Sequence, residues 1–153
     1  MKTIAENIAV IRENIARAAR ESGRNPEDIL LVAATKMNDG DRVREAVRGG
    51  IDAAGENRVQ ELLEKYEQGA YEGVPLHFIG TLQSNKVKYL IGKVCLIESV
   101  NSMKCLREIS RCAGKAGITQ EVLIEVNIGG EASKSGIAPD AIPAFLEEAN
   151  GLP

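Results

Sequence analysis

The lysine at position 36 is the residue of this chain with the clearest chemical potential. It closes the apolar run ILLVAATK, in which no polar residue precedes Thr35. Such a run is typical of a strand buried on both faces of a parallel sheet. Partial desolvation at the end of that strand would disfavour the ammonium form of Lys36, and a neutral amine can form an imine. The alternative, which position alone favours, is that the side chain simply extends to solvent.

Polar residues also follow the later apolar runs. The stretch GENRVQE from Gly55 offers a close backbone approach, a carboxylate, an amide and then a helix start that attracts anions, although Asn57 could simply cap that helix. The stretch HFIGTLQSNK contains the only histidine, His77, and a single histidine in an apolar strand is more often a core residue than a catalyst. The loop EASKSG, with Lys134, has a composition that suits anions but by itself indicates only a polar loop.

Strands and helices alternate along the whole chain. A capping-box pattern at Thr3 and Glu6 begins the first helix, which Gly23 ends. The later helices are predicted in DGDRVREAVRGG, with Asp41 as its cap, and in RVQELLEKYEQG, SNKVKYLIGK, SMKCLREISRCAGKAG and APDAIPAFLEEAN. The strands are predicted in ILLVAATK, IDAAGEN, LHFIG, VCLIES and EVLIEVNI. This alternation predicts an α/β protein built from parallel βα units.

The number of strands limits the possible architectures. A closed (β/α)8 barrel of the TIM type needs about 250 residues. The 153 residues present would supply five of its eight strands and leave an unpaired strand at each edge. We therefore expect a single, truncated partial barrel domain over residues 1–153. An open doubly wound sheet, which needs no more chain than this, is the alternative.

Composition and charge exclude several classes of protein. Hydrophobic residues make up 44% and charged residues 27%, as in a folded globular domain. The net charge of −3, without a basic block, argues against a nucleic-acid partner. Three cysteines without a CxxC pair, together with one histidine, predict reduced thiols and no zinc site. No stretch has the apolar run of a signal peptide or a membrane span, so a cytoplasmic location is expected.

Four stretches taken together resemble the YggS/PROSC family of pyridoxal phosphate homeostasis proteins. They are AATK around Lys36, GENRVQE from Gly55, HFIGTLQSNK from His77 and NIGGEASKSGI from Asn127. They occur in the family's order, one at each strand end, and cover most of the chain from Ile29 to Ile137. The resemblance implies a fold-type III barrel similar to the N-terminal domain of alanine racemase. In that fold Lys36 would hold pyridoxal 5′-phosphate as a Schiff base, which reverses the solvent-exposed interpretation of this lysine.

The resemblance also implies further residues and a function. Asn57 would contact the cofactor ring, and His77, Asn85, Lys86 and Lys134 would line or support the mouth of the site. The implied function is cofactor binding and homeostasis without robust turnover, in a monomer that can release the cofactor to pyridoxal-phosphate-dependent apo-enzymes. Members of the family continue for several more strands, where a serine- and glycine-rich segment and an arginine-glycine run hold the phosphate. Without those strands, weak binding is expected.

Two other functions belong to different classes. In an amino-acid racemase, Lys36 would also move the α-proton, and a second catalytic acid or base would be needed. In an inactive truncated folding unit, the open edge strands would pair with another copy and produce a dimer. Formation of D-alanine would indicate the first, and a concentration-dependent dimer that ignores the cofactor would indicate the second.

Overall fold

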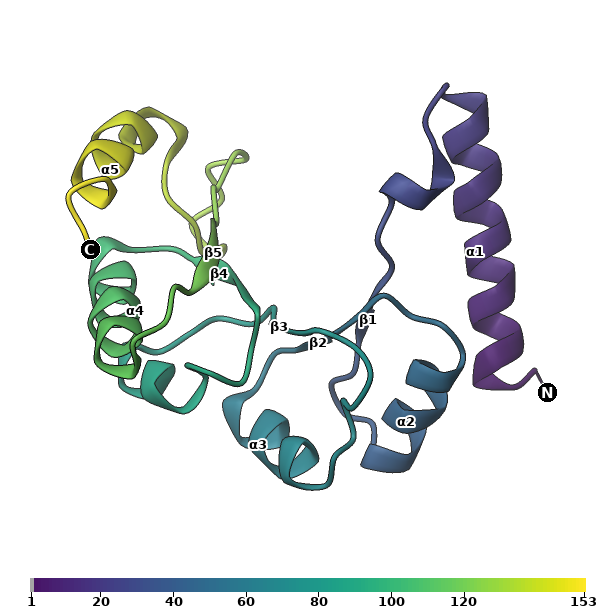
Figure 1. The fold of residues 1–153 in the computed structure, drawn as a ribbon. Helices are drawn as coiled ribbons and strands as arrows, with labels where there is room; N and C mark the ends of the chain where they lie inside the picture. The colour runs from purple at the N-terminus through teal and green to yellow at the C-terminus, as the bar shows by residue number, and fades with distance from the viewer. Residues whose placement is uncertain (1) are drawn as a thin grey trace. The chain divides into compact units, whose positions relative to one another are not determined.

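A computed structural model describes residues 2–153 of the protein (Figure 1). The chain forms two compact units, which are described separately. The first unit extends to Glu56 and includes Gln60–Leu76, whereas the second contains Asn57–Val59 and His77–Pro153. The prediction of a single domain over residues 1–153 stays a prediction.

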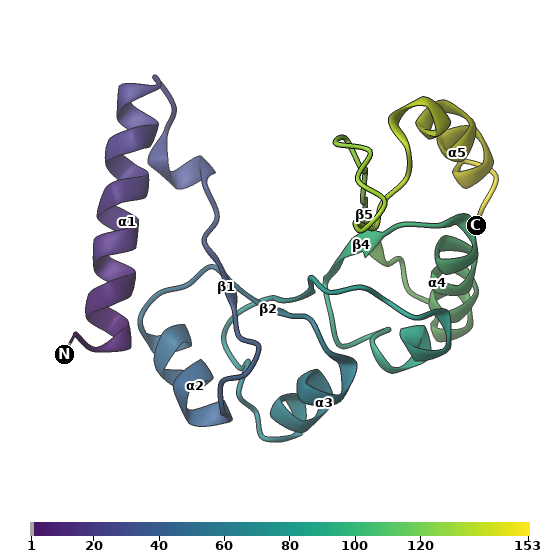
Figure 2. The same ribbon diagram turned by 180° about the vertical axis from the view of Figure 1, so that it is seen from behind.

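The first unit contains a parallel pair of strands with helices beside it. Ala34 of the first strand is in register with Gly55 of the second. Helices α2 and α3 lie on the same side of this strand pair (Figures 1 and 2), and α1 packs against α2. The elements, in chain order, are α1 (Ile4–Glu21), η1 (Pro26–Asp28), β1 (Val32–Ala34), α2 (Gly40–Arg48), β2 (Ala53–Glu56) and α3 (Val59–Glu67).

Two helix starts in this unit show how side chains set the boundaries. The predicted capping box of α1 is confirmed, because Glu6 N donates to Thr3 Oγ1 at 3.2 Å and Thr3 N donates to Glu6 Oε2 at 2.7 Å. The predicted cap of α2 was wrong by two residues. Arg42 N donates to Asp39 Oδ1 at 2.9 Å, so Asp39 is the cap. Asp41 lies inside the first turn, where its carboxylate is too far along the helix to accept that bond.

The strand that leads to Lys36 is more exposed than its sequence predicts. Leu30 is 67% exposed and Ala34 is exposed, whereas the whole of β2 is buried. The prediction that ILLVAATK is buried on both faces was therefore wrong. The strand is exposed because it lies at an edge of the sheet: within the described chain, β1 has a single hydrogen-bonded neighbour, β2.

A partly buried ion pair joins α1 to Asp52, the residue before β2. Arg12 Nη2 lies 2.7 Å from Asp52 Oδ2, and the same carboxylate accepts a hydrogen bond from Leu31 N at 2.5 Å. The hydrogen bond from Arg12 is the main cause that lowers the pKa of Asp52 below its ordinary value of 3.8, and burial opposes it. The charged carboxylate is thus the form that the fold favours.

This ion pair predicts a pH dependence of stability. A lowered folded-state pKa contributes stability that is fully present above pH 3.8 and is lost as the pH falls through the folded value. We expect Asp52→Asn to lower the free energy of unfolding by about 1 kcal/mol at pH 7. The difference from the wild type should shrink below pH 3.8, as measured by urea unfolding at both pH values. A difference that stays constant with pH would contradict this role of the charge.

The second unit continues the parallel arrangement. His77 is in register with Leu96, and Leu96 is in register with Glu121. Helix α4 contacts both η2 and α5. The elements are β3 (Leu76–Phe78, whose first residue belongs to the first unit), η2 (Ser84–Tyr89), β4 (Leu96–Val100), α4 (Met103–Ala116), β5 (Glu121–Ile124), η3 (Pro139–Ala141) and α5 (Ile142–Ala149).

Two elements of the second unit have a helix type or a burial pattern that the sequence did not specify. The stretch SNKVKYLIGK was predicted to be helical, and its first six residues form a 3-10 helix whose bonds span three residues, such as Lys86 N to Gln83 O at 2.9 Å. The strand β5 alternates exposed and half-buried residues and leaves Leu123 on the open face. The other predicted strands of this unit, β3 and β4, are confirmed and mainly buried.

Candidate functional site

Lys36 occupies a tight turn at the carboxyl end of β1. Asn38 N donates to Thr35 O at 3.2 Å, which closes a four-residue turn with Lys36 and Met37 at its centre. Thr35 is buried, whereas Lys36 is exposed and Met37 is 84% exposed. The Lys36 side chain thus extends to solvent, as the alternative favoured by its position alone predicted, and the desolvation weighed against that alternative is not found in this structure. The amine projects from a turn, and no hydrogen bond or ion pair to its Nζ occurs among the described residues.

The backbone of this turn is strained at Met37. Its φ of 60° lies in the left-handed region, and Met37 is the one non-glycine residue of the described chain with a positive φ. A side chain in that region costs roughly 1–3 kcal/mol, and such residues persist only where the surroundings hold them. The contacts on both sides of Lys36 must therefore stabilise this conformation.

A buried ion pair from β2 and α3 contacts the turn on its N-terminal side. Lys65 Nζ lies 2.7 Å from Glu56 Oε2 and donates to Thr35 O at 2.9 Å. Glu56 is completely buried and Lys65 is 6% exposed. The carbonyl that Lys65 contacts belongs to the peptide bond between Thr35 and Lys36. The buried ammonium is thus bonded to the backbone of the candidate nucleophile itself.

Two hydroxyl groups also lie beside the Glu56 carboxylate. Thr35 Oγ1 lies 3.2 Å from Glu56 Oε2 and also 3.2 Å from Gly55 O, so its single hydrogen serves one acceptor at a time. Tyr71 OH donates to Glu56 Oε2 at 3.4 Å. Burial, followed by the negative charge of Glu56, raises the pKa of Tyr71 above its ordinary value. Tyr71 therefore stays protonated and remains a donor to the carboxylate.

A second carboxylate contacts the turn on its C-terminal side. Glu61, in the first turn of α3, accepts a hydrogen bond from Met37 N at 2.9 Å, and it lies 3.5 Å from Lys65 Nζ. Sequence reasoning missed Glu61, Lys65 and Tyr71 because they lie within or after a helix whose pattern is that of an ordinary amphipathic segment. The spacing of Glu61 and Lys65, four residues apart on one helix face, was the available signal.

Asn57, the second predicted site residue, lies in the second unit against the end of β3. A Cβ atom added to Gly80 would lie 2.1 Å from Asn57 O and 2.5 Å from Asn57 Cα. Only glycine therefore permits this approach of the two backbones. Gly80, which lies in the motif HFIGTLQSNK, thus determines where the backbone of Asn57 in the motif GENRVQE can lie.

This close approach predicts a large effect of one methyl group. We expect Gly80→Ala to lower the free energy of unfolding by about 2 to 3 kcal/mol, because the Cβ must displace the backbone of Asn57. Gly114→Ala is the matched control, since its Cβ would meet no atom within 4 Å and the exposed position lies inside α4. It should stabilise the protein by about 0.5 to 1 kcal/mol. Urea unfolding measures both, and equal effects would contradict the clash.

His77, the third predicted residue, is buried in the middle of β3. Its Nδ1 lies 2.6 Å from Glu98 Oε1 of β4, the neighbouring strand. One hydrogen bond that fixes a buried ring matches the structural interpretation of this histidine, and its predicted contact with a cofactor stays a prediction. Of the other motif residues in this unit, Asn85 and Lys86 lie in η2, where Lys86 Nζ is 5.7 Å from the ring of Tyr89.

Lys134, the fourth predicted residue, is exposed on a loop that folds back on itself. Asn127 N donates to Ile137 O at 3.0 Å, and this bond brings the two ends of the loop together. Asn127 Nδ2 also donates to Lys134 O at 3.4 Å. Gly136 has a φ of 116°, and a Cβ there would lie 2.6 Å from Asn127 N. The backbone at Lys134 is therefore held by the loop, while its ammonium reaches solvent.

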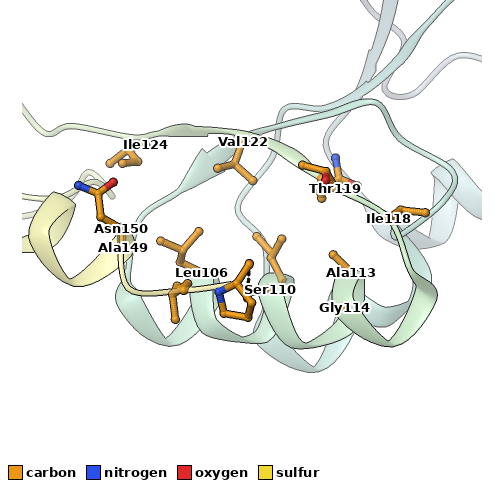
Figure 3. Close-up of a pocket in the computed structure, with 14 residues that line it drawn as sticks. Leu106, Ser110, Ala113, Gly114, Ile118, Thr119, Val122, Ile124, Ala149 and Asn150 are labelled. Atoms are coloured by element: carbon orange, nitrogen blue, oxygen red, sulfur yellow. Dashed lines mark hydrogen bonds between the residues drawn. The ribbon is translucent and has the colours of Figure 1, made fainter.

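A cavity in the second unit is lined by none of the predicted site residues. It has a volume of about 330 Å³ and lies between α4, β5 and the C-terminal segment (Figure 3). Leu106, Val122 and Ile124 supply much of its apolar wall, and Ser110 Oγ donates to Pro153 O at 3.2 Å beside it. No charged side chain lines this cavity. Its chemistry does not suit a phosphorylated ligand, which requires convergent donors.

Neither a membrane-spanning helix nor a metal-binding cluster occurs among the described residues. None of the helices in residues 2–153 combines the length and the apolar composition that crossing a membrane requires. Over the same residues, no cluster of histidine, cysteine, aspartate and glutamate side chains is arranged to hold a metal ion.

Known proteins resemble this chain along nearly its whole length. Residues 7–153 match the model of the alanine racemase N-terminal domain family. The chain is 42% identical over 148 residues to a pyridoxal phosphate homeostasis protein of Aquifex aeolicus, a match that covers 97% of this chain and 65% of that protein. The chain thus spans about two thirds of the length of this relative.

Two solved structures share the fold. An unknown protein from Bifidobacterium adolescentis superposes with a TM-score of 0.89 at 36% identity, over 97% of this chain and 64% of that one. PipY of Synechococcus elongatus with PLP bound gives a TM-score of 0.81 at 29% identity, over 99% of this chain and 66% of PipY. These likenesses confirm the predicted parallel α/β fold and the resemblance to the YggS/PROSC proteins. The chain belongs to the family of the alanine racemase N-terminal domain.

Proposed function

We propose that this protein binds pyridoxal 5′-phosphate and that Lys36 bonds covalently to the cofactor. The observation that carries the proposal is the exposed Lys36 side chain on a strained turn whose backbone is fixed on both sides. A related protein, PipY, has a solved structure with PLP bound. The Aquifex relative is a pyridoxal phosphate homeostasis protein, and we propose the same role for this chain.

The residues around Lys36 fit the aldehyde end of this cofactor. Pyridoxal phosphate supplies an aldehyde, which condenses with a primary amine and releases water. The Lys36 amine supplies the nucleophile after it loses a proton to solvent, and because no described group pairs with its Nζ, no hydrogen bond or ion pair must be broken first. Its fixed backbone limits the directions that the side chain can take, which lowers the entropy lost on bonding.

We further propose that Asn57, His77 and Lys134 contact the cofactor. Asn57 is half-buried and its position is fixed by Gly80, which suits an amide that orients a ring. His77 is fixed by Glu98 and would act by shape and hydrogen bonding. Lys134 carries a positive charge on a closed loop, which suits an anionic group. These are supporting contacts, and the covalent bond is assigned to Lys36 alone.

We propose that the protein holds and releases the cofactor, without robust catalytic turnover, in the cytoplasm. Release would occur when another amine replaces Lys36, and pyridoxal-phosphate-dependent apo-enzymes are the proposed recipients. The name of the Aquifex relative supports homeostasis as the role. A racemase would require a second acid or base beside the substrate, and formation of D-alanine by the purified chain would contradict the proposal of binding without turnover.

The test is to find which lysine bonds the cofactor. The full chain is incubated with pyridoxal phosphate and reduced with borohydride, and the modified peptides are identified by mass spectrometry. We expect the label to concentrate on the peptide that contains Lys36. Lys115 on α4 is the internal reference, because it is an exposed lysine remote in sequence from every motif. Equal labelling of Lys36 and Lys115 would contradict the proposed function.

A further inference from the structure

Three charged side chains hold the backbone of the Lys36 turn from two sides. Lys65 Nζ donates to Thr35 O at 2.9 Å, on the N-terminal side of Lys36. Glu61 accepts from Met37 N at 2.9 Å, on the C-terminal side. Glu56 holds the Lys65 ammonium at 2.7 Å. Lys65 and Glu61 thus bond to the backbone on either side of Lys36, and Glu56 bonds to Lys65. None of these bonds involves the Lys36 side chain.

We propose that Glu61 and the buried pair of Glu56 and Lys65 are positioning residues for the Lys36 amine. This inference rests on the proposed function, in which Lys36 bonds the cofactor, and it adds the residues that prepare Lys36 for that reaction. They act through the turn: they stabilise the positive φ of Met37 and thereby fix the direction in which the Lys36 side chain leaves the chain.

The burial of these charges supports a specific role over a general contribution to stability. A buried ion pair is weak evidence for stability, because the loss of hydration offsets much of the attraction between the charges. Here the Lys65 ammonium donates one of its three hydrogens to a main-chain carbonyl of the turn, that of Thr35. An apolar side chain at position 65 could fill the same space but could not bond to that carbonyl.

The strain at Met37 provides the second, independent observation. A turn with a positive φ at this position normally uses glycine, because a side chain is unfavourable there. Met37 adopts this conformation while its own side chain is 84% exposed, so packing of that side chain does not explain it. The hydrogen bond from Met37 N to the Glu61 carboxylate is a contact that favours the strained conformation directly. Loss of this bond should let the turn relax.

The experiment compares Glu61→Ala, Glu61→Gln and Glu64→Ala in the full chain. The alanine at position 61 removes the acceptor for Met37 N, the glutamine keeps an acceptor of the same length, and Glu64 is an exposed residue of the same helix. Two quantities are measured: the exchange rate of the Met37 amide hydrogen by NMR, and the rate at which pyridoxal phosphate labels Lys36 before reduction. The first requires no bound cofactor.

We expect Glu61→Ala to raise the exchange rate of the Met37 amide and to slow the labelling of Lys36 by about tenfold, the size of effect that one charge-assisted hydrogen bond provides. Glu61→Gln should restore the labelling rate to within about threefold of the wild type, and Glu64→Ala should change neither quantity. A merely structural role would lower the stability without changing the labelling rate of the folded protein.

A second variant tests the buried pair without leaving one charge unpaired. Glu56→Gln combined with Lys65→Met removes both charges and the bond to Thr35 O, and it should slow labelling by a similar factor. Suppose that the wild type labels Lys36 preferentially, and that Glu61→Ala and the double variant label it as fast as the wild type does. The positioning role is then overturned and the proposed function stands. If the wild type shows no preference for Lys36, the proposed function is overturned together with the positioning role.

Discussion

Lys36→Ala is expected to remove the borohydride-stable label from the peptide that contains residue 36 and to leave only the background of the surface lysines. The reason is that alanine has no amine to bond the aldehyde, while residue 36 lies in an exposed turn whose backbone bonds do not depend on its side chain. A preference of about 1.4 kcal/mol for one site corresponds to a tenfold excess of label. Because the other exposed lysines of the chain still react, each with about a tenth of that occupancy, total incorporation at low cofactor concentration should fall by about half, as measured by intact mass.

Two controls separate the loss of the amine from a loss of structure. Lys36→Arg keeps the positive charge but removes the primary amine, so it should lose the label as completely as Lys36→Ala does. Lys115→Ala removes an exposed lysine of α4 and should leave the label at Lys36 unchanged. Urea unfolding should show that all three variants lie within about 0.5 kcal/mol of the wild type. Persistence of most of the label in Lys36→Arg would show that another lysine carries the cofactor.

Lys65→Met should have the largest effect on stability of any single substitution considered for this chain. It leaves the Glu56 carboxylate completely buried without the ammonium that lies 2.7 Å from it. Removal of one partner of a buried ion pair typically costs about 3 to 5 kcal/mol. Because native domains are stable by only about 5 to 15 kcal/mol, this is a large share of the total. The free energy of unfolding in urea at pH 7 measures it.

The double variant Glu56→Gln with Lys65→Met distinguishes the unpaired charge from the lost packing. The glutamine introduced at position 56 is neutral, and its oxygen can still accept from the hydroxyls of Thr35 and Tyr71. The double variant should therefore recover most of the stability that Lys65→Met loses. If it is as unstable as the single variant, the cost comes from the shape of residue 65. Lys115→Met, at an exposed site, should change the stability by less than about 0.5 kcal/mol.

The order of the elements was predictable from the sequence because local periodicity and capping residues determine it. Thr3 and Glu6 form the first helix start as predicted, and the apolar runs before Lys36, Asn57 and Gly80 all become strands. The type of the segment around Lys86 was not predictable, because α and 3-10 helices share the same residues and differ only in which carbonyl each amide selects.

Part of the candidate site was also predictable. The motifs identified Lys36 at the end of the first strand, and the family relationship they indicated is confirmed. The burial of the strand that leads to Lys36 was predicted wrongly, because burial depends on how many strands and helices cover β1 and this strand is an edge. A run of apolar residues indicates that a segment tends to be buried, but the strands and helices that bury it come from elsewhere in the chain.

The sequence by itself determined that Lys36 ends a strand of a parallel α/β fold and which family the chain belongs to. Only the tertiary structure decided that Lys65, Glu56 and Glu61 hold the backbone on both sides of that lysine. The physical reason is the separation of the partners along the chain. The two bonds to the turn join residues that are 24 and 30 positions apart, and the bond between Lys65 and Glu56 joins residues that are nine positions apart. Helical and strand periods do not specify such partners, which depend on how α3 packs beside β1 and β2.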